Sequence, residues 1–242
     1  MNRRTDRLAA WAGAAVAVLL LWAAYAAGLL GYLLSEPGEV LRLLGQHVVL
    51  VLTSGATAVT LGLGLGIAIS RAPLRRLAYP VIAGVSLGQT VPSLALLALI
   101  FALVRTIGFF PAYLALTLVT LLPIVRNTYQ GLRGVDRDIL EAGRGMGMSA
   151  RQILWRLELP NALGAIFAGI RTALVINVGS AALAFLIGGG GLGDLIFSGI
   201  DTRRNDILIA GALPTVILAL AVDWLLGRLE RVVVSRGIRA DG

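Results

Sequence analysis

Six long apolar runs, separated by connections that carry arginines, constrain the fold of this chain most. They span residues 8–34, 47–70, 77–104, 111–125, 162–187 and 207–226, and the fourth can continue to about Gln130. A helix rises about 1.5 Å per residue, so it needs about 20 apolar residues to cross about 30 Å of hydrocarbon. With 57% hydrophobic and 14% charged residues, the chain is too apolar for an ordinary soluble domain. The sequence predicts an all-α integral membrane protein with about six transmembrane helices.

The distribution of the arginines predicts the orientation of these helices. All 21 basic residues are arginine, and the net charge is +8. If the N-terminus is cytoplasmic, sixteen arginines lie in the inner segments, four in the outer connections and one, Arg171, near the entrance of the fifth run, where it can snorkel toward the headgroups. Because cytoplasmic connections are enriched in basic residues, both termini are predicted to be cytoplasmic. Membrane lipids then account for the positive charge, and no nucleic-acid partner is expected.

The first run has a second interpretation as a secretory signal. Arg3, Arg4 and Arg7 precede it, and Ala24-Tyr25-Ala26 resembles a small-residue cleavage site. The apolar part of a signal is usually about 7 to 15 residues long, and this run is longer. We therefore expect an uncleaved first helix.

Several kinds of chemistry have no support in the sequence. The chain has no cysteine and one histidine, His47, so no metal site is expected, and His47 is predicted to be solvated or to cap a helix. No motif of a catalytic site is present, so the chain is not predicted to be an enzyme. It also has no lysine, so any ATP must be bound by another chain. Small residues recur every fourth position in the second run and predict close helix packing, at Ser54, Ala58, Gly62, Gly66 and Ser70.

The polar connection between the fourth and fifth runs predicts a structured surface element. Asp136 and Asp138 suit a helix N-terminus, Gly147 permits a change of direction, and Ser149 can cap a second helix that Pro160 would end. Two short helices joined at a glycine would form a rigid knob that a partner can grip. Amphipathic helices lying on the lipid surface are the alternative.

The same connection resembles the EAA loop of ABC-importer permeases. Glu141-Ala142-Gly143, then Gly147 and Leu159-Pro160, follow the spacing of that loop, with Gly143 where alanine is usual and Leu157 where isoleucine is common. The resemblance implies the fold of a type I ABC importer transmembrane domain and a coupling helix that seats in a separate ATPase, which would bind ATP and Mg. It assigns coupling to Glu141, Ala142, Gly143, Arg144, Gly147, Leu159 and Pro160. It also implies an extracytoplasmic solute-binding protein and a second permease, identical or homologous.

Further segments resemble permeases for glycine betaine, choline or carnitine. They lie at 89–96, 122–128, 145–148, 168–173 and 188–196. This implies an osmoprotectant importer in the cytoplasmic membrane of a bacterium or archaeon, although permeases for methionine and other small solutes share the loop. The expected organisation is a first helix and external connection at 1–46, a permease domain at 47–230 and a cytoplasmic tail at 231–242.

Polar residues inside apolar runs are the candidates for the transport pathway. They are Gln89, Thr90, Ser93 and Asn177, and Pro92 is expected to break the third helix. Hydrogen bonding between helices is an alternative role. The glycines at 188–191 suit either a flexible gate or a close-packed turn. A secondary transporter, for which Asp223 beside Arg228 is the only candidate carboxylate, and a membrane scaffold remain as other classes of function.

Overall fold

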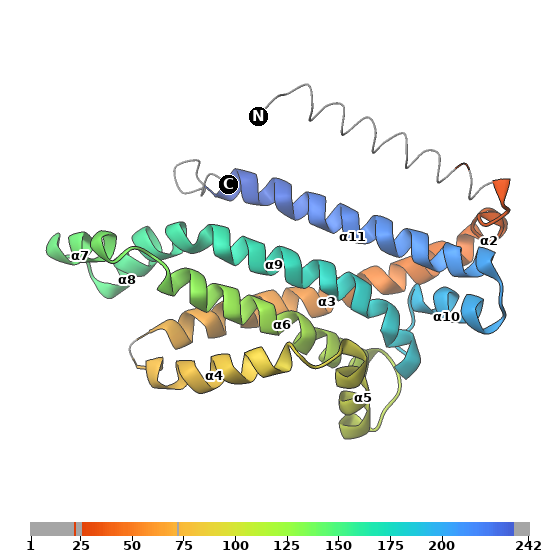
Figure 1. Cartoon of the computed structure of the whole chain (residues 1–242), viewed down its shortest axis with the longest axis horizontal. Helices are drawn as coiled ribbons and strands as arrows, with labels where there is room; N and C mark the ends of the chain where they lie inside the picture. The colour runs from red at the N-terminus through yellow and green to blue at the C-terminus, as the bar shows by residue number, and fades with distance from the viewer. Residues whose placement is uncertain (1–21, 23–25, 72, 235–242) are drawn as a thin grey trace.

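The computed structural model describes residues 22, 26–71 and 73–234, and every regular element in this part of the chain is a helix (Figure 1). Its helices are α2 (Gly31–Ser35), α3 (Pro37–Ser70), α4 (Arg75–Gly88), α5 (Ser93–Val104), α6 (Phe109–Arg133), α7 (Arg137–Gly145), α8 (Ala150–Ile153), α9 (Leu159–Ala181), α10 (Gly193–Asp201) and α11 (Asn205–Val233). A π-helical segment, Leu154–Glu158, joins α8 to α9, and a 3₁₀ segment, Ala182–Ile187, follows α9. Helices α3, α6, α9 and α11 run lengthwise, with α7 and α8 at one end and α2 and α10 at the other.

Four helical stretches are long and apolar enough to cross a membrane: Pro37–Ser70, Phe109–Arg133, Ala150–Ile187 and Asn205–Val233. They confirm the second, fourth, fifth and sixth predicted runs, and each helix extends beyond the run. The third run is not one helix, because α4 ends at Gly88 and α5 begins at Ser93, directly after Pro92. Most of the first run lies outside the described residues. Its end is not continuous helix, since residues 27–30 form a turn with Gly28 at a φ of 71°.

The packing of α3 on α6 and α9 depends on small residues, as predicted from the second run. A Cβ atom added to Gly62 would lie 2.7 Å from Ile124 Cγ2, and one added to Gly66 would lie 2.6 Å from Thr128 Cβ. Ala58, which lies one turn before Gly62 in α3, is fully buried. The backbones therefore approach as closely as glycine allows, which is how helices gain van der Waals contact where no water is present to drive association.

His47 is not at a solvated helix entrance, as the sequence suggested, but fully buried. Because α3 begins at Pro37, this residue lies nearly three turns inside the helix. Its Nε2 atom is 3.1 Å from the carbonyl oxygen of Val178 in α9. The ring also packs on the glycine turn, where a Cβ atom at Gly191 would lie 3.2 Å from Nδ1 of His47.

The glycine segment that follows the 3₁₀ helix is a close-packed turn. Gly188, Gly190 and Gly191 have φ values of 75°, 70° and 92°, which side chains with a Cβ atom rarely adopt. Gly190 faces Gln46, whose Oε1 atom accepts a hydrogen bond from the N–H of Gly191 at 3.2 Å. The geometry favours the packed-turn alternative over the flexible gate.

Candidate functional site

The connection after α6 folds as the local sequence signals predicted. The Asp136 carboxylate accepts a hydrogen bond from the Asp138 N–H at 2.9 Å and caps α7. Gly147 follows this helix with a φ of 74°. Ser149 and Gln152 then form a reciprocal capping box at the start of α8, with bonds of 3.3 and 2.8 Å. We call α7, the turn at Gly147, α8 and the π-helical segment the knob.

Pro160 does not end the second helix of the knob, contrary to the sequence prediction. The helix runs from α8 through the π-helical segment Leu154–Glu158 into α9, and Pro160 occupies the first turn of α9. A proline lacks the N–H that would bond back one turn, and the wider π turn just before it accommodates the change in hydrogen bonding. The Leu159 N–H bonds to the Leu154 carbonyl, five residues back. The knob is therefore a direct extension of a membrane-spanning helix.

The residues that the resemblance assigned to coupling occupy two levels of the knob. Glu141, Ala142, Arg144 and Gly147 are exposed. Gly143 is buried, and Leu159 and Pro160 are half-buried at the base, where α9 starts. Only the first group is available to a partner in this structure, and the second group supports it from below.

Gly143 is the contact between the two helices of the knob. A Cβ atom at this position would lie 2.5 Å from Cδ1 of Leu157, closer than real Cβ atoms come to other atoms. Gly143 and Leu157 are also the two positions that depart from the usual EAA pattern. The Leu157 side chain, which reaches further than isoleucine would, thus fills the space that glycine at 143 leaves open in place of alanine.

Exposed apolar side chains on the knob were not recognised from the sequence. Met146 is 73% exposed, Trp155 62% and Ile139 38%. Large apolar residues in a polar segment are typical of a surface that contacts another protein or the lipid surface. The signal available in the sequence was the presence of tryptophan and methionine among charged residues.

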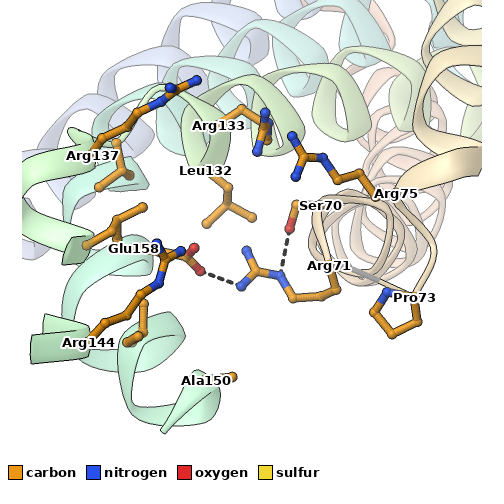
Figure 2. A pocket seen from close by; sticks show the side chains of 13 residues that line it. Ser70, Arg71, Pro73, Arg75, Leu132, Arg133, Arg137, Arg144, Ala150 and Glu158 are labelled. Carbon is orange, nitrogen blue, oxygen red and sulfur yellow. Dashed lines mark hydrogen bonds and ion pairs between the residues drawn. The ribbon is translucent and has the colours of Figure 1, made fainter. Parts of the chain in front are cut away.

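A basic cavity of about 400 Å³ separates the knob from the ends of α3, α4 and α6 (Figure 2). We call it the arginine cavity, because five arginines line it: Arg71, Arg75, Arg133, Arg137 and Arg144. Among the described residues that line it, Glu158 is the only acidic one, and it pairs with Nη1 of Arg71 at 2.5 Å. The Arg71 Nε atom also donates to the Ser70 hydroxyl at 2.9 Å. The ion pair between Arg71 and Glu158 joins the end of α3 to the base of the knob.

A second cavity, also about 400 Å³, lies at the break between α4 and α5. Its lining includes Gln89 and Ser93, together with Arg126 and Asn127 of α6 and Thr172 of α9. We call it the polar cavity. Arg126 donates a hydrogen bond to Oε1 of Gln89 at 3.2 Å.

The structure brings some of the predicted pathway residues together at the polar cavity and separates others. Pro92 breaks the helix beside it, and the Ser93 hydroxyl accepts a hydrogen bond from Ser180 at 3.2 Å. Thr90 is exposed within the break and does not line the cavity. Asn177 is fully buried, and its amide donates to the Ser54 hydroxyl at 3.0 Å and the Val51 carbonyl at 3.2 Å. Its position favours hydrogen bonding between α9 and α3.

The long apolar helices, the broken helix beside a polar cavity and the knob on a membrane-spanning helix define a membrane-embedded transport subunit. The chain belongs to the family described as binding-protein-dependent transport system inner membrane component, which matches residues 58–235. The family description makes it the membrane component of a transport system that depends on a binding protein.

Curated relatives cover most of the chain. The carnitine transport permease protein OpuCB of Listeria monocytogenes is 44% identical over 80% of this chain and 88% of its own length. The glycine betaine/carnitine/choline transport system permease protein OpuCB of Bacillus subtilis (strain 168) is 39% identical over 86% and 94%. The osmoprotectant import permease protein OsmW of Salmonella typhimurium is 44% identical over 86% and 98%. The chain is thus similar to ABC permeases of osmoprotectant systems.

Solved structures share the fold. A chain of the methionine ABC transporter MetNI, in inward-facing conformations, has a TM-score of 0.73 and 24% identity and covers 83% of this chain and 99% of that chain. A chain of an amino acid ABC transporter with histidines has a TM-score of 0.69 and 20% identity, and the match covers 84% of this chain and 97% of that chain. The architecture is that of a type I ABC importer transmembrane domain.

Proposed function

We propose that this chain forms the membrane pathway for a small osmoprotectant, such as glycine betaine, choline or carnitine, and couples it to a separate ATPase through residues 141–160. The observation that carries the proposal is the construction of the knob. Its second helix, α8, continues through the π-helical segment into α9, and α7, which carries the exposed Glu141, packs on that segment through Gly143 and Leu157. A displacement of the knob by a partner is therefore transmitted directly to a membrane-spanning helix.

The route through the membrane runs past the polar cavity. Gln89 and Ser93 line it, and Thr90 and Pro92 belong to the break that opens it. Non-helical backbone at membrane depth is tolerated where it lines a water-filled space. A second permease, identical or homologous, completes the enclosure by facing this side of the chain, and rocking of the two bundles exposes the route to one side and then the other.

Selection among osmoprotectants is assigned to the binding protein outside the membrane. A quaternary ammonium group is best recognised by aromatic faces. No aromatic side chain is among the described residues that line the polar cavity, and Arg126 is its one charged group. The cavity offers hydrogen bonds without a site for the cation, which suits passage better than tight binding.

The coupling role is tested by reversing the charge of the exposed Glu141. The Glu141→Arg chain is reconstituted with an ABC ATPase and a binding protein from the same genome. We expect the complex to lose uptake driven by ATP, while the chain still inserts and retains its helical content. Asp201→Arg is the matched control, because Asp201 is also exposed but lies on α10 at the opposite end. Normal uptake by Glu141→Arg would contradict the docking role of the knob.

The alternative substrates are distinguished in the same vesicles. Uptake of radiolabelled glycine betaine, carnitine and choline is compared with uptake of methionine, which represents an amino-acid permease. Transport of methionine alone would replace the osmoprotectant assignment. Vesicles without the ATPase test a self-contained secondary transporter, for which uptake would persist.

A further inference from the structure

The arginine cavity holds more positive charge than the described residues balance. Arg71 pairs with Glu158, but within the described part of the chain no ion pair or hydrogen bond engages the side chain of Arg75, Arg133, Arg137 or Arg144. Arg75 comes from α4, which is remote in sequence from α6 and α7, the consecutive helices that carry the other three arginines. In Figure 2, Arg75 and Arg133 approach the cavity from one side and Arg144 from the other. Like charges gathered around one space repel each other unless an anion occupies it.

The usual reasons for surface arginines do not account for this convergence. Helix dipoles favour a cation in the last turn of a helix, which explains Arg133 and Arg144. Arg75 and Arg137 are the first residues of α4 and α7, where the dipole disfavours a cation. Enrichment of basic residues at the cytoplasmic end explains their number but not their direction.

Several guanidinium groups around one concavity match the chemistry of a phosphate group. Each guanidinium can donate two parallel hydrogen bonds to phosphate oxygens, and a phosphate carries more charge than one carboxylate. The cavity volume of about 400 Å³ falls within the range of small-ligand sites.

We propose that the arginine cavity binds a phosphate-bearing anion, supplied either by the headgroup of an anionic phospholipid or by free inorganic phosphate. Bound there, the anion bridges α4 and α6 to α7 and ties the knob to the membrane-spanning bundle. The assignment of this end to the cytoplasmic side rests on the proposed function. The binding of the anion itself requires neither the ATPase nor transport.

The test uses the full chain purified without its partners. The cavity variant is Arg75→Gln with Arg133→Gln, because neither residue belongs to the knob. The matched control is Arg76→Gln with Arg228→Gln, which removes the same charge from exposed residues outside both the cavity lining and the knob. Native mass spectrometry measures retention of phosphatidylglycerol against phosphatidylcholine. Calorimetric titration measures binding of inorganic phosphate against chloride at constant ionic strength.

We expect the cavity variant to lose at least about tenfold in affinity for the phosphate probe, and the control to change by less than about twofold. Binding of phosphatidylglycerol without binding of inorganic phosphate identifies the lipid as the source, and binding of inorganic phosphate without retention of phosphatidylglycerol identifies the free ion. Equal losses in both variants, or no binding of either probe to the native chain, would overturn the proposal. So would an unchanged affinity of the cavity variant. If that variant also failed to capture the ATPase in a separate pull-down, the arginines would serve acidic side chains of that protein.

Circular dichroism shows whether the cavity variant folds. If it does not, the single change Arg75→Gln at the exposed first residue of α4 replaces it, with Arg76→Gln as its control. Failure of anion binding leaves the Glu141→Arg experiment unaffected, since that residue does not line the arginine cavity. The two proposals therefore fail separately.

Discussion

The contact between Gly143 and Leu157 predicts that these two positions depend on each other. Gly143→Ala restores the residue that is usual in the EAA loop, and its Cβ would lie 2.5 Å from Leu157 Cδ1, which must move. Replacing glycine by alanine inside a helix gains about 1 kcal/mol, whereas overpacking a filled site costs about 1 to 3 kcal/mol. The single change should therefore destabilise the knob by about 0 to 2 kcal/mol. Leu157→Ile alone should cost less than about 1.5 kcal/mol, the usual limit for apolar swaps of equal volume.

The double variant should be more stable than the sum of the single changes predicts. With isoleucine at 157, the Cδ1 methyl group of Leu157 no longer occupies the space beside residue 143. Alanine at 143 then contributes its helix propensity without the clash. We expect a coupling free energy of about 1 to 2 kcal/mol, within the range found for residues in contact. Thermal unfolding of the four purified chains in one detergent, followed by circular dichroism, measures this cycle. A difference of 1 kcal/mol corresponds to roughly 2 to 4 °C in Tm for a chain of this size.

Gly145 supplies the control within the same helix. A Cβ atom there meets nothing within 4 Å, so Gly145→Ala should show only the gain in helix propensity, up to about 1 kcal/mol. The reasoning is refuted if Gly143→Ala stabilises as much as Gly145→Ala does. It is also refuted if the cycle with Leu157→Ile is additive within about 0.5 kcal/mol.

Three further predictions concern the bundle. Gly66→Ala should destabilise the chain by about 1 to 3 kcal/mol in thermal unfolding, because its Cβ would lie 2.6 Å from Thr128 Cβ, whereas Gly64→Ala, with open space around it, should not. Asn177→Ala should cost about 1 to 3 kcal/mol through its lost hydrogen bonds to α3, and altered uptake with an unchanged Tm would instead place it on the route. Burial raises the pKa of Asp194, so its protonated form is favoured in the fold and its ionisation becomes a cost as pH rises above the unfolded value of about 3.9. Asp194→Asn should therefore raise Tm at neutral pH and have little effect near pH 4, and an equal effect at both would contradict this.

The membrane-spanning helices could be predicted because their apolar length is a local property of the sequence. The ends at Ser70 and Val104 were also predicted correctly, since α3 and α5 end directly before Arg71 and Arg105. Other boundaries could not be predicted, because a charge that ended the apolar run did not end the helix. Glu39 and Arg42 lie one turn apart on the surface of α3 and pair at 2.6 Å, so the helix begins before them and His47 becomes internal. The break at Pro92 followed from its missing N–H, whereas the same property at Pro160 was absorbed by a π turn.

The knob was predictable for the same reason as the spans, since capping residues and a glycine turn act within a few positions. The arginine cavity was not, because it is assembled from the ends of separate helices. In the sequence, Arg75 and Arg133 contributed only to the count that set the orientation. Their convergence depends on the packing of α4 and α6 on α3, which no local pattern encodes.

The pairing of Arg171 with Asp223 bears on the choice between an ATP-driven and an ion-driven transporter. The sequence placed Asp223 beside Arg228 and left Arg171 to the headgroups. In the structure the Asp223 carboxylate accepts two hydrogen bonds from Arg171, at 2.5 and 2.6 Å, and joins α11 to α9. A carboxylate that couples ion flow must exchange its partner during the cycle, whereas a two-point bond to a guanidinium holds it in one charge state. The one candidate for ion coupling thus links two helices, which supports the proposal that this protein is driven through the knob.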